Sequence, residues 1–125
     1  MRILYIDDDR INLLLFEQVC RLAHTLEVAT AGSGVEALQV AREFAPEVLV
    51  IDLHLPDTTG FELLPQLRAE AGLSQVPAFL CTADEPSEVQ ADAQRAGFSG
   101  CWAKPVDVTQ MLAELARIGD APPSP

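Results

Sequence analysis

Five side chains that could handle a metal ion and a phosphoryl group stand where short apolar runs of the sequence end. They are Asp7, Asp8, Asp52, Thr82 and Lys104. Carboxylates that crowd together repel one another unless a cation neutralises them, and their hard oxygen atoms suit Mg²⁺ or Mn²⁺. A hydroxyl and an ammonium group can hold the oxygens of a transferred phosphoryl group. These residue types therefore favour phosphoryl transfer to an aspartate with the help of a divalent ion.

The apolar runs that precede these residues are predicted to be β-strands. They span residues 2–6, 48–51, 78–81 and 101–103, and residues 26–29 form a further short strand. Segments with helical periodicity separate the runs, and this alternation predicts an α/β domain with a parallel sheet and five helices. Ligands bind outside the carboxyl ends of the strands in such sheets, so the polar residues are expected to meet in one pocket.

Helix starts are marked by capping boxes, in which a polar cap is followed three residues later by Glu or Gln. The pairs are Ser33 with Glu36, Thr59 with Glu62, Ser87 with Gln90, and Asp107 with Gln110. The first helix is marked by an apolar face at residues 11, 14, 15, 19 and 22. Residues 119–125 contain three prolines and no periodicity. They are expected to be a disordered tail or linker stub after a domain of residues 1–118.

The composition argues against several classes of partner. The chain has 125 residues, enough for one domain with a core, and 19 acidic against 8 basic residues give a formal charge of −11. Such a charge opposes binding to nucleic acid or to an anionic membrane. The three cysteines lack metal-ligand and redox spacing, and no export signal or membrane-spanning run is recognisable. A cytoplasmic protein whose partners are other proteins is therefore expected.

Four motifs carry the polar residues at characteristic intervals. They are Ile6-Asp7-Asp8-Asp9, Asp52-Leu53-His54-Leu55-Pro56-Asp57-Thr58-Thr59-Gly60, Thr82-Ala83 and Lys104-Pro105. In this combination the chain, apart from its tail, resembles the receiver domains of two-component response regulators. The resemblance implies a doubly wound, flavodoxin-like sheet of five parallel strands in the order 2-1-3-4-5. It also implies that Asp52 is the phosphoacceptor, that Asp7, Asp8, Asp52 and the backbone carbonyl of His54 hold Mg²⁺, and that Thr82 and Lys104 bind the phosphoryl oxygens.

The same resemblance implies the partners of the domain. A histidine kinase or a histidine phosphotransfer protein would donate the phosphoryl group, an unknown downstream protein would read the resulting switch, and a homodimer is compatible with the family. The domain would catalyse only its own phosphorylation and dephosphorylation, so it would be a signalling phosphoacceptor and not an enzyme. One position departs from the family pattern, because Cys101 stands where receivers commonly carry a mobile aromatic residue. A switch read mainly through Thr82 and the residues after it is therefore expected.

Three other interpretations remain open. A phosphatase of the haloacid-dehalogenase type also uses a strand-end aspartate, Mg²⁺, a hydroxyl and a lysine, although the acidic residues after Lys104 are scattered here. A pseudo-receiver would keep the fold as an interaction module without phosphorylation, and Mg²⁺ binding would separate it from an active receiver. Residues 32–37 have the Gly-x-Gly-x-x-Ala form of a dinucleotide site. Glu36 would repel a pyrophosphate there, so a glycine turn with a capping box is favoured.

Overall fold

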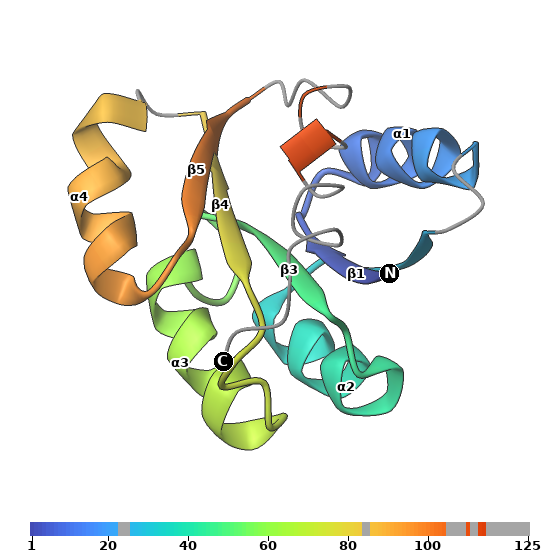
Figure 1. Cartoon of the computed structure of the whole chain (residues 1–125), viewed down its shortest axis with the longest axis horizontal. Coiled ribbons are helices and arrows are strands. Elements are labelled where there is room, and N and C mark those ends of the chain that lie inside the picture. The colour runs from blue at the N-terminus through green and yellow to red at the C-terminus, as the bar shows by residue number, and fades with distance from the viewer. Residues whose placement is uncertain (23–25, 84–85, 105–109, 111–112, 115–125) are drawn as a thin grey trace.

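A five-stranded parallel sheet forms the centre of the computed structural model, which describes residues 1–22, 26–83, 86–104, 110 and 113–114. The strand order is β2-β1-β3-β4-β5, as the sequence predicted (Figure 1). The strands are β1 (Arg2–Ile6), β2 (Glu27–Ala31), β3 (Val48–Asp52), β4 (Ala78–Thr82) and β5 (Gly100–Ala103). The predicted strands are thus confirmed, and β2 begins and ends slightly later than expected.

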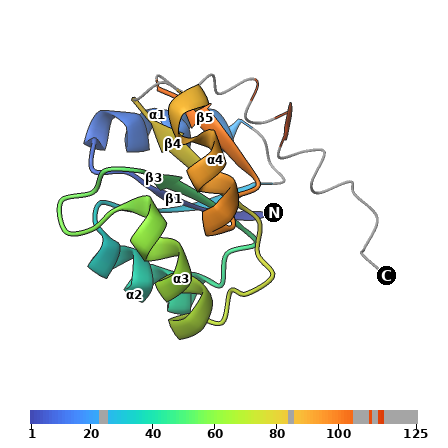
Figure 2. The same cartoon turned by 90° about the vertical axis from the view of Figure 1, so that its left-hand side faces the viewer.

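Four helices are described, and they cover both faces of the sheet. They are α1 (Arg10–Arg21), α2 (Gly34–Phe44), α3 (Gly60–Glu70) and α4 (Pro86–Ala96). Figure 2 shows α1 on one side of the sheet and α2 with α3 on the other. The predicted fifth helix and the predicted tail of residues 119–125 fall largely or wholly outside the described residues. Within the described part of the chain, no helix is both long enough and apolar enough to cross a bilayer.

The core consists of two layers, one on each face of the sheet. All five residues of β3 and of β4 are buried, which is the pattern of central strands in a parallel sheet covered on both sides. Alternate strand residues divide between the layers. Leu4, Leu49 and Leu80 pack with side chains of α2, α3 and α4, whereas Tyr5, Val50 and Phe79 pack with Phe16 and Cys20 of α1. The residues directly after each strand continue this alternation, so successive side chains there also point to opposite faces of the sheet.

Two of the predicted helix caps are confirmed, and one helix start differs. The hydroxyl of Ser33 accepts a hydrogen bond from the Glu36 amide, and that of Thr59 accepts one from the Glu62 amide. Helix α4 begins at Pro86, one residue before the predicted cap. Proline is favoured at the first position of a helix, because the first amides have no partner within the helix. The last predicted pair, which starts at residue 107, lies outside the described residues.

The apolar face predicted for the first helix is not the face that packs on the sheet. Four of its five members, Ile11, Leu14, Leu15 and Leu22, are between 56% and 81% exposed, and Val19 is half-buried. The buried positions of α1 are instead Phe16 and Cys20. The ring of Phe16 stacks on that of Tyr5 in β1, with their centroids 4.4 Å apart. This aromatic contact fixes the rotation of the helix and leaves the second apolar stripe on the outside.

Candidate functional site

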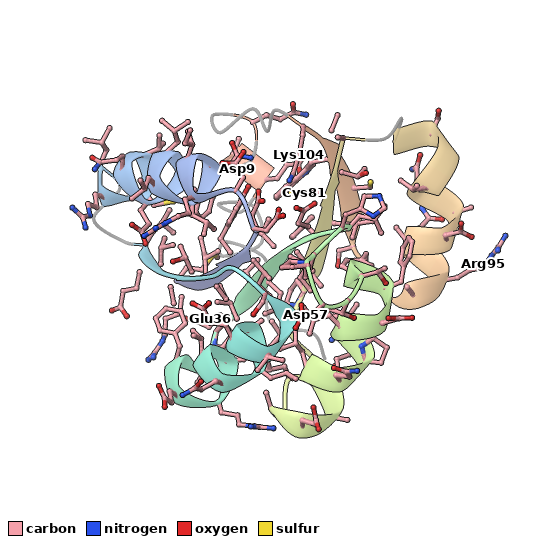
Figure 3. The ribbon with its side chains drawn as sticks, turned by 180° about the vertical axis from the view of Figure 1, so that it is seen from behind. Asp9, Glu36, Asp57, Cys81, Arg95 and Lys104 are labelled. Atoms are coloured by element: carbon pink, nitrogen blue, oxygen red, sulfur yellow. The ribbon has the colours of Figure 1, made fainter. Side chains whose placement is uncertain are left out.

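The carboxyl ends of three neighbouring strands bring the predicted site residues together. Asp7 follows β1, Asp52 is the last residue of β3, and Thr82 is the last residue of β4. All three are buried, with at most 5% of their surface exposed. Lys104 follows β5, and its backbone amide donates to the carbonyl of Thr82 over 2.8 Å. Figure 3 shows Lys104 close to Cys81 at this edge of the sheet.

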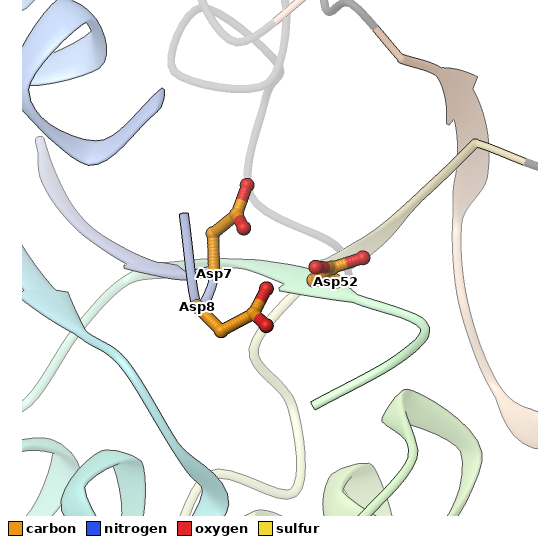
Figure 4. Close-up of side chains that lie close together, drawn as sticks. All are labelled: Asp7, Asp8 and Asp52. Carbon is orange, nitrogen blue, oxygen red and sulfur yellow. The ribbon is translucent and has the colours of Figure 1, made fainter. Parts of the chain in front are cut away.

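Three carboxylates form a cluster that could hold a cation. One oxygen atom each of Asp7, Asp8 and Asp52 lies within 4.8 Å of the others, and Figure 4 shows the three groups at the ends of β1 and β3. Asp8 is exposed, so the cluster is open to solvent on one side. A set of carboxylate oxygens without nitrogen or sulfur ligands fits a hard divalent ion such as Mg²⁺. His54, also predicted for this site, lies in the loop directly after β3, where it forms an isolated antiparallel β-bridge with Thr59.

Lys104 provides the positive charge of the cluster. Its ammonium nitrogen lies 2.8 Å from Oδ2 of Asp52 and 3.2 Å from Oδ2 of Asp7, and 17% of its side chain is exposed. Burial alone would lower the pKa of Lys104. The hydrogen bond and charge of Asp52, with a further contribution from Asp7, outweigh burial and raise this pKa above its ordinary value. Lys104 is therefore fully protonated at neutral pH.

Asp52 is held in an environment that disfavours its charge. Burial raises the pKa of Asp52 above its ordinary value, although the hydrogen bond and charge of Lys104 oppose this effect. The neighbouring Asp7 raises the pKa of Asp52 further through like-charge repulsion. A divalent cation among the carboxylates would reverse this repulsion and favour the ionised form. The ionised form of Asp52 is therefore favoured by positive charge close to its carboxylate.

Neutral donors that the sequence analysis missed also hold Asp7. Its Oδ2 accepts hydrogen bonds from the Tyr5 hydroxyl over 3.2 Å and from the Asn12 side chain over 3.3 Å. Its Oδ1 accepts from the Asp9 amide over 2.9 Å. The signal for Tyr5 was present, because residues two apart in a strand lie on the same face. Asn12, in the first turn of α1, had no such signal.

A second contact that the sequence analysis missed ties the loop after β3 to α2. The Asp57 carboxylate accepts hydrogen bonds from the amides of Gly34 and Val35 over 2.8 and 3.0 Å. These bonds lower the pKa of Asp57 below its ordinary value. Figure 3 shows Asp57 between α2 and α3. A dinucleotide pyrophosphate would need these same amides, so their occupation by a carboxylate removes the basis for the dinucleotide interpretation.

The last strand carries Trp102 and Cys101, and the sequence analysis singled out the second. The half-buried ring of Trp102 stacks on Phe79 with a centroid separation of 4.6 Å. The indole nitrogen donates to the carboxylate of Glu114 over 2.7 Å. Cys101, on the opposite face, packs at the margin of the core layer that α2, α3 and α4 cover.

Comparison with known proteins gives consistent matches along the chain. The family model described as "Response regulator receiver domain" matches residues 3–116. The polar-differentiation response regulator DivK of Brucella ovis is 29% identical over 123 residues, which are 95% of this chain and 97% of that protein. The structure of the chemotaxis response regulator CheY4 of Vibrio cholerae is 26% identical, with a TM-score of 0.84 over 94% of this chain and 97% of that one. A putative response regulator from Chloroflexus aurantiacus is 29% identical, with a TM-score of 0.83 over 94% of this chain and 95% of that one.

Proposed function

The chain belongs to the response regulator receiver domains of two-component signalling, and we propose that it accepts a phosphoryl group on Asp52 with Mg²⁺ bound nearby. The observation that carries this proposal is the position of Lys104, whose ammonium nitrogen lies 2.8 Å from Asp52 and 3.2 Å from Asp7. A nucleophilic carboxylate, a carboxylate cluster and a fixed cation at one strand edge are the components that phosphoryl transfer requires.

In the proposed reaction a carboxylate oxygen of Asp52 attacks the phosphorus atom of a phosphohistidine. The new O–P bond forms as the N–P bond of the donor breaks, and the electron pair of that bond stays on the imidazole nitrogen. Lys104 binds an oxygen of the transferred group, and Thr82, at the end of the neighbouring strand, donates its hydroxyl to another. Asp7, Asp8, Asp52 and the backbone carbonyl of His54 would hold Mg²⁺. When bound, the ion offsets the negative charge on the phosphoryl oxygens.

The proposal includes the partners and the site of action. The donor is a histidine kinase or a histidine phosphotransfer protein, and a downstream protein reads the phosphorylated form. The domain acts in the cytoplasm and catalyses no reaction besides its own phosphorylation and dephosphorylation. The family match over residues 3–116 favours this function over a haloacid-dehalogenase phosphatase. The presence of the carboxylate cluster and of Lys104 favours it over a pseudo-receiver.

The test is the incorporation of one phosphoryl group from acetyl phosphate, measured by intact-protein mass spectrometry. We expect the unaltered chain to gain the group in Mg²⁺ and to lose this ability in EDTA. Asp52→Asn should gain none, whereas Asp92→Asn, which alters an exposed aspartate of α4, should react like the unaltered chain. Equal incorporation by Asp52→Asn, or incorporation that is independent of the metal, would refute the assignment. Absence of incorporation in the unaltered chain would favour the pseudo-receiver.

A further inference from the structure

The buried tyrosine beside the acidic cluster donates its hydroxyl to a carboxylate of that cluster. Tyr5 is 3% exposed, and its ring stacks on Phe16 at an interplanar angle of 28°. Its hydroxyl points at Oδ2 of Asp7 over 3.2 Å. The phenol is therefore a hydrogen-bond donor to this carboxylate oxygen.

Three donors share one oxygen of the Asp7 carboxylate, and a fourth contacts the other oxygen. Tyr5, Asn12 and Lys104 contact its Oδ2, and the Asp9 amide contacts its Oδ1. One carboxylate oxygen offers about two lone-pair positions, so Oδ2 is crowded by its three donors, and a metal ion that binds Asp7 through Oδ2 has to displace one of them. The donors differ in charge, and this difference decides which one leaves. A divalent cation repels the Lys104 ammonium group, whereas it does not repel a neutral hydroxyl or amide.

We infer that the Tyr5 hydroxyl is a positioning group for the divalent ion, which holds the Asp7 carboxylate toward Asp8 and Asp52 after Lys104 has moved to the phosphoryl group. Asn12 supports the same carboxylate from α1. The inference rests on the proposed function in one respect, namely that Asp7 belongs to the Mg²⁺ site. Groups that hydrogen-bond a metal ligand orient it and raise its affinity for the metal, and their loss costs about 10- to 100-fold in affinity.

The test compares Mg²⁺ affinity by isothermal titration calorimetry in the full chain and in Tyr5→Phe. This substitution removes one oxygen atom and keeps the ring that packs on Phe16. We expect the dissociation constant for Mg²⁺ to rise about tenfold. The matched control is Phe16→Leu, which loosens the same packing but keeps the hydroxyl, and which should lower stability with little change in Mg²⁺ affinity.

A second measurement needs no substitution. The chain contains one tyrosine, so labelling with tyrosine that carries ¹³C at the ζ position gives one resonance, which reports directly on the hydroxyl-bearing carbon. Titration with Mg²⁺ should shift this resonance to saturation with the dissociation constant that calorimetry gives. Asn12→Ala should also weaken Mg²⁺ binding.

The outcomes separate this inference from the proposed function. If the unaltered chain does not bind Mg²⁺, the proposed function is wrong. If the unaltered chain binds Mg²⁺ and Tyr5→Phe binds it equally or more tightly, only the role of Tyr5 is wrong. An equal loss of affinity in Phe16→Leu and Tyr5→Phe would also overturn the inference, because ring packing and not the hydroxyl would then control the ion.

Discussion

Removing the charge of Lys104 while keeping its length, as in Lys104→Met, should make the ion-free protein markedly less stable. The two carboxylates that this ammonium contacts are buried, with 1% and 6% of their side-chain surface exposed. Removing one partner of a buried ion pair costs about 3–5 kcal/mol, because an uncompensated charge is left behind. Asp52 can relieve part of this penalty by taking up a proton, since its pKa is already raised. We therefore expect a loss near the lower limit, about 3 kcal/mol.

The assay is equilibrium unfolding by urea at neutral pH in EDTA. In thermal unfolding under the same conditions, a loss of about 3 kcal/mol corresponds to a fall in melting temperature of roughly 12 °C for a domain of this size. The matched control is Arg95→Met on α4, where the ion pair with Asp92 is 78% and 60% exposed on its two sides, and Figure 3 shows Arg95 extending away from the molecule. This exposed pair should contribute less than about 0.5 kcal/mol.

Addition of Mg²⁺ should reverse much of the loss in Lys104→Met. An ion that binds the folded cluster and not the unfolded chain stabilises the protein by an amount that grows with the logarithm of its affinity. In the unaltered chain it has to displace Lys104, whereas the variant has no such competitor. If Mg²⁺ binds Lys104→Met about tenfold more tightly than it binds the unaltered chain, saturating Mg²⁺ stabilises the variant by about 1.4 kcal/mol more than it stabilises the unaltered chain. The reasoning fails if Lys104→Met and Arg95→Met cost the same in EDTA, or if Mg²⁺ stabilises both proteins equally.

Three further predictions concern the surroundings of the site. Gly60→Ala should lower the free energy of unfolding in urea by about 1–3 kcal/mol, because the added methyl group would lie 2.8 Å from a leucine of β4 and 3.0 Å from the last carbonyl of β3. The control Gly32→Ala, whose methyl group meets no atom closer than 3.8 Å, should lower it less. A larger loss in Gly32→Ala than in Gly60→Ala would contradict this packing. The lowered pKa of Asp57 means that its bonds to α2 stabilise the fold above the ordinary pKa and are lost as pH falls through the folded one. The stability difference between the unaltered chain and Asp57→Ala should therefore shrink below about pH 4, and a difference independent of pH would be evidence against these bonds. Because Cys101 is small, amide NMR shifts on adding beryllofluoride should be larger at Thr82 than in β5, and equal shifts would refute a shortened switch.

The position of the site could be predicted from the sequence because it depends on a simple rule. Parallel strands end at one edge, so the polar residues that follow strand-like runs have to meet there, and Asp7, Asp52 and Lys104 do so. The helix caps at Ser33 and Thr59 were predictable for a similar reason, since both depend on residues only three apart. In each case the determining information is local.

The parts that the sequence did not reveal depend on contacts between distant segments. Nothing near Asp57 indicates that its carboxylate binds amides of Gly34 and Val35, since that contact depends on how α2 and the loop after β3 approach each other. The packed face of α1 was predicted wrongly because the helix has two apolar stripes. Only the stacking of Phe16 on Tyr5, a contact with a different segment, selects between them.

The outer stripe of α1 also bears on how the protein behaves in concentrated solution. Ile11, Leu14, Leu15 and Leu22 present apolar surface to water, while a formal charge of −11 makes every copy repel the others. Salt weakens this repulsion, because the Debye length falls from about 10 Å at 0.1 M to about 3 Å at 1 M. Sulfate in addition strengthens the attraction between apolar surfaces. Colloidal stability of this protein therefore depends on low ionic strength, and salting-out with sulfate should begin with copies that meet through α1.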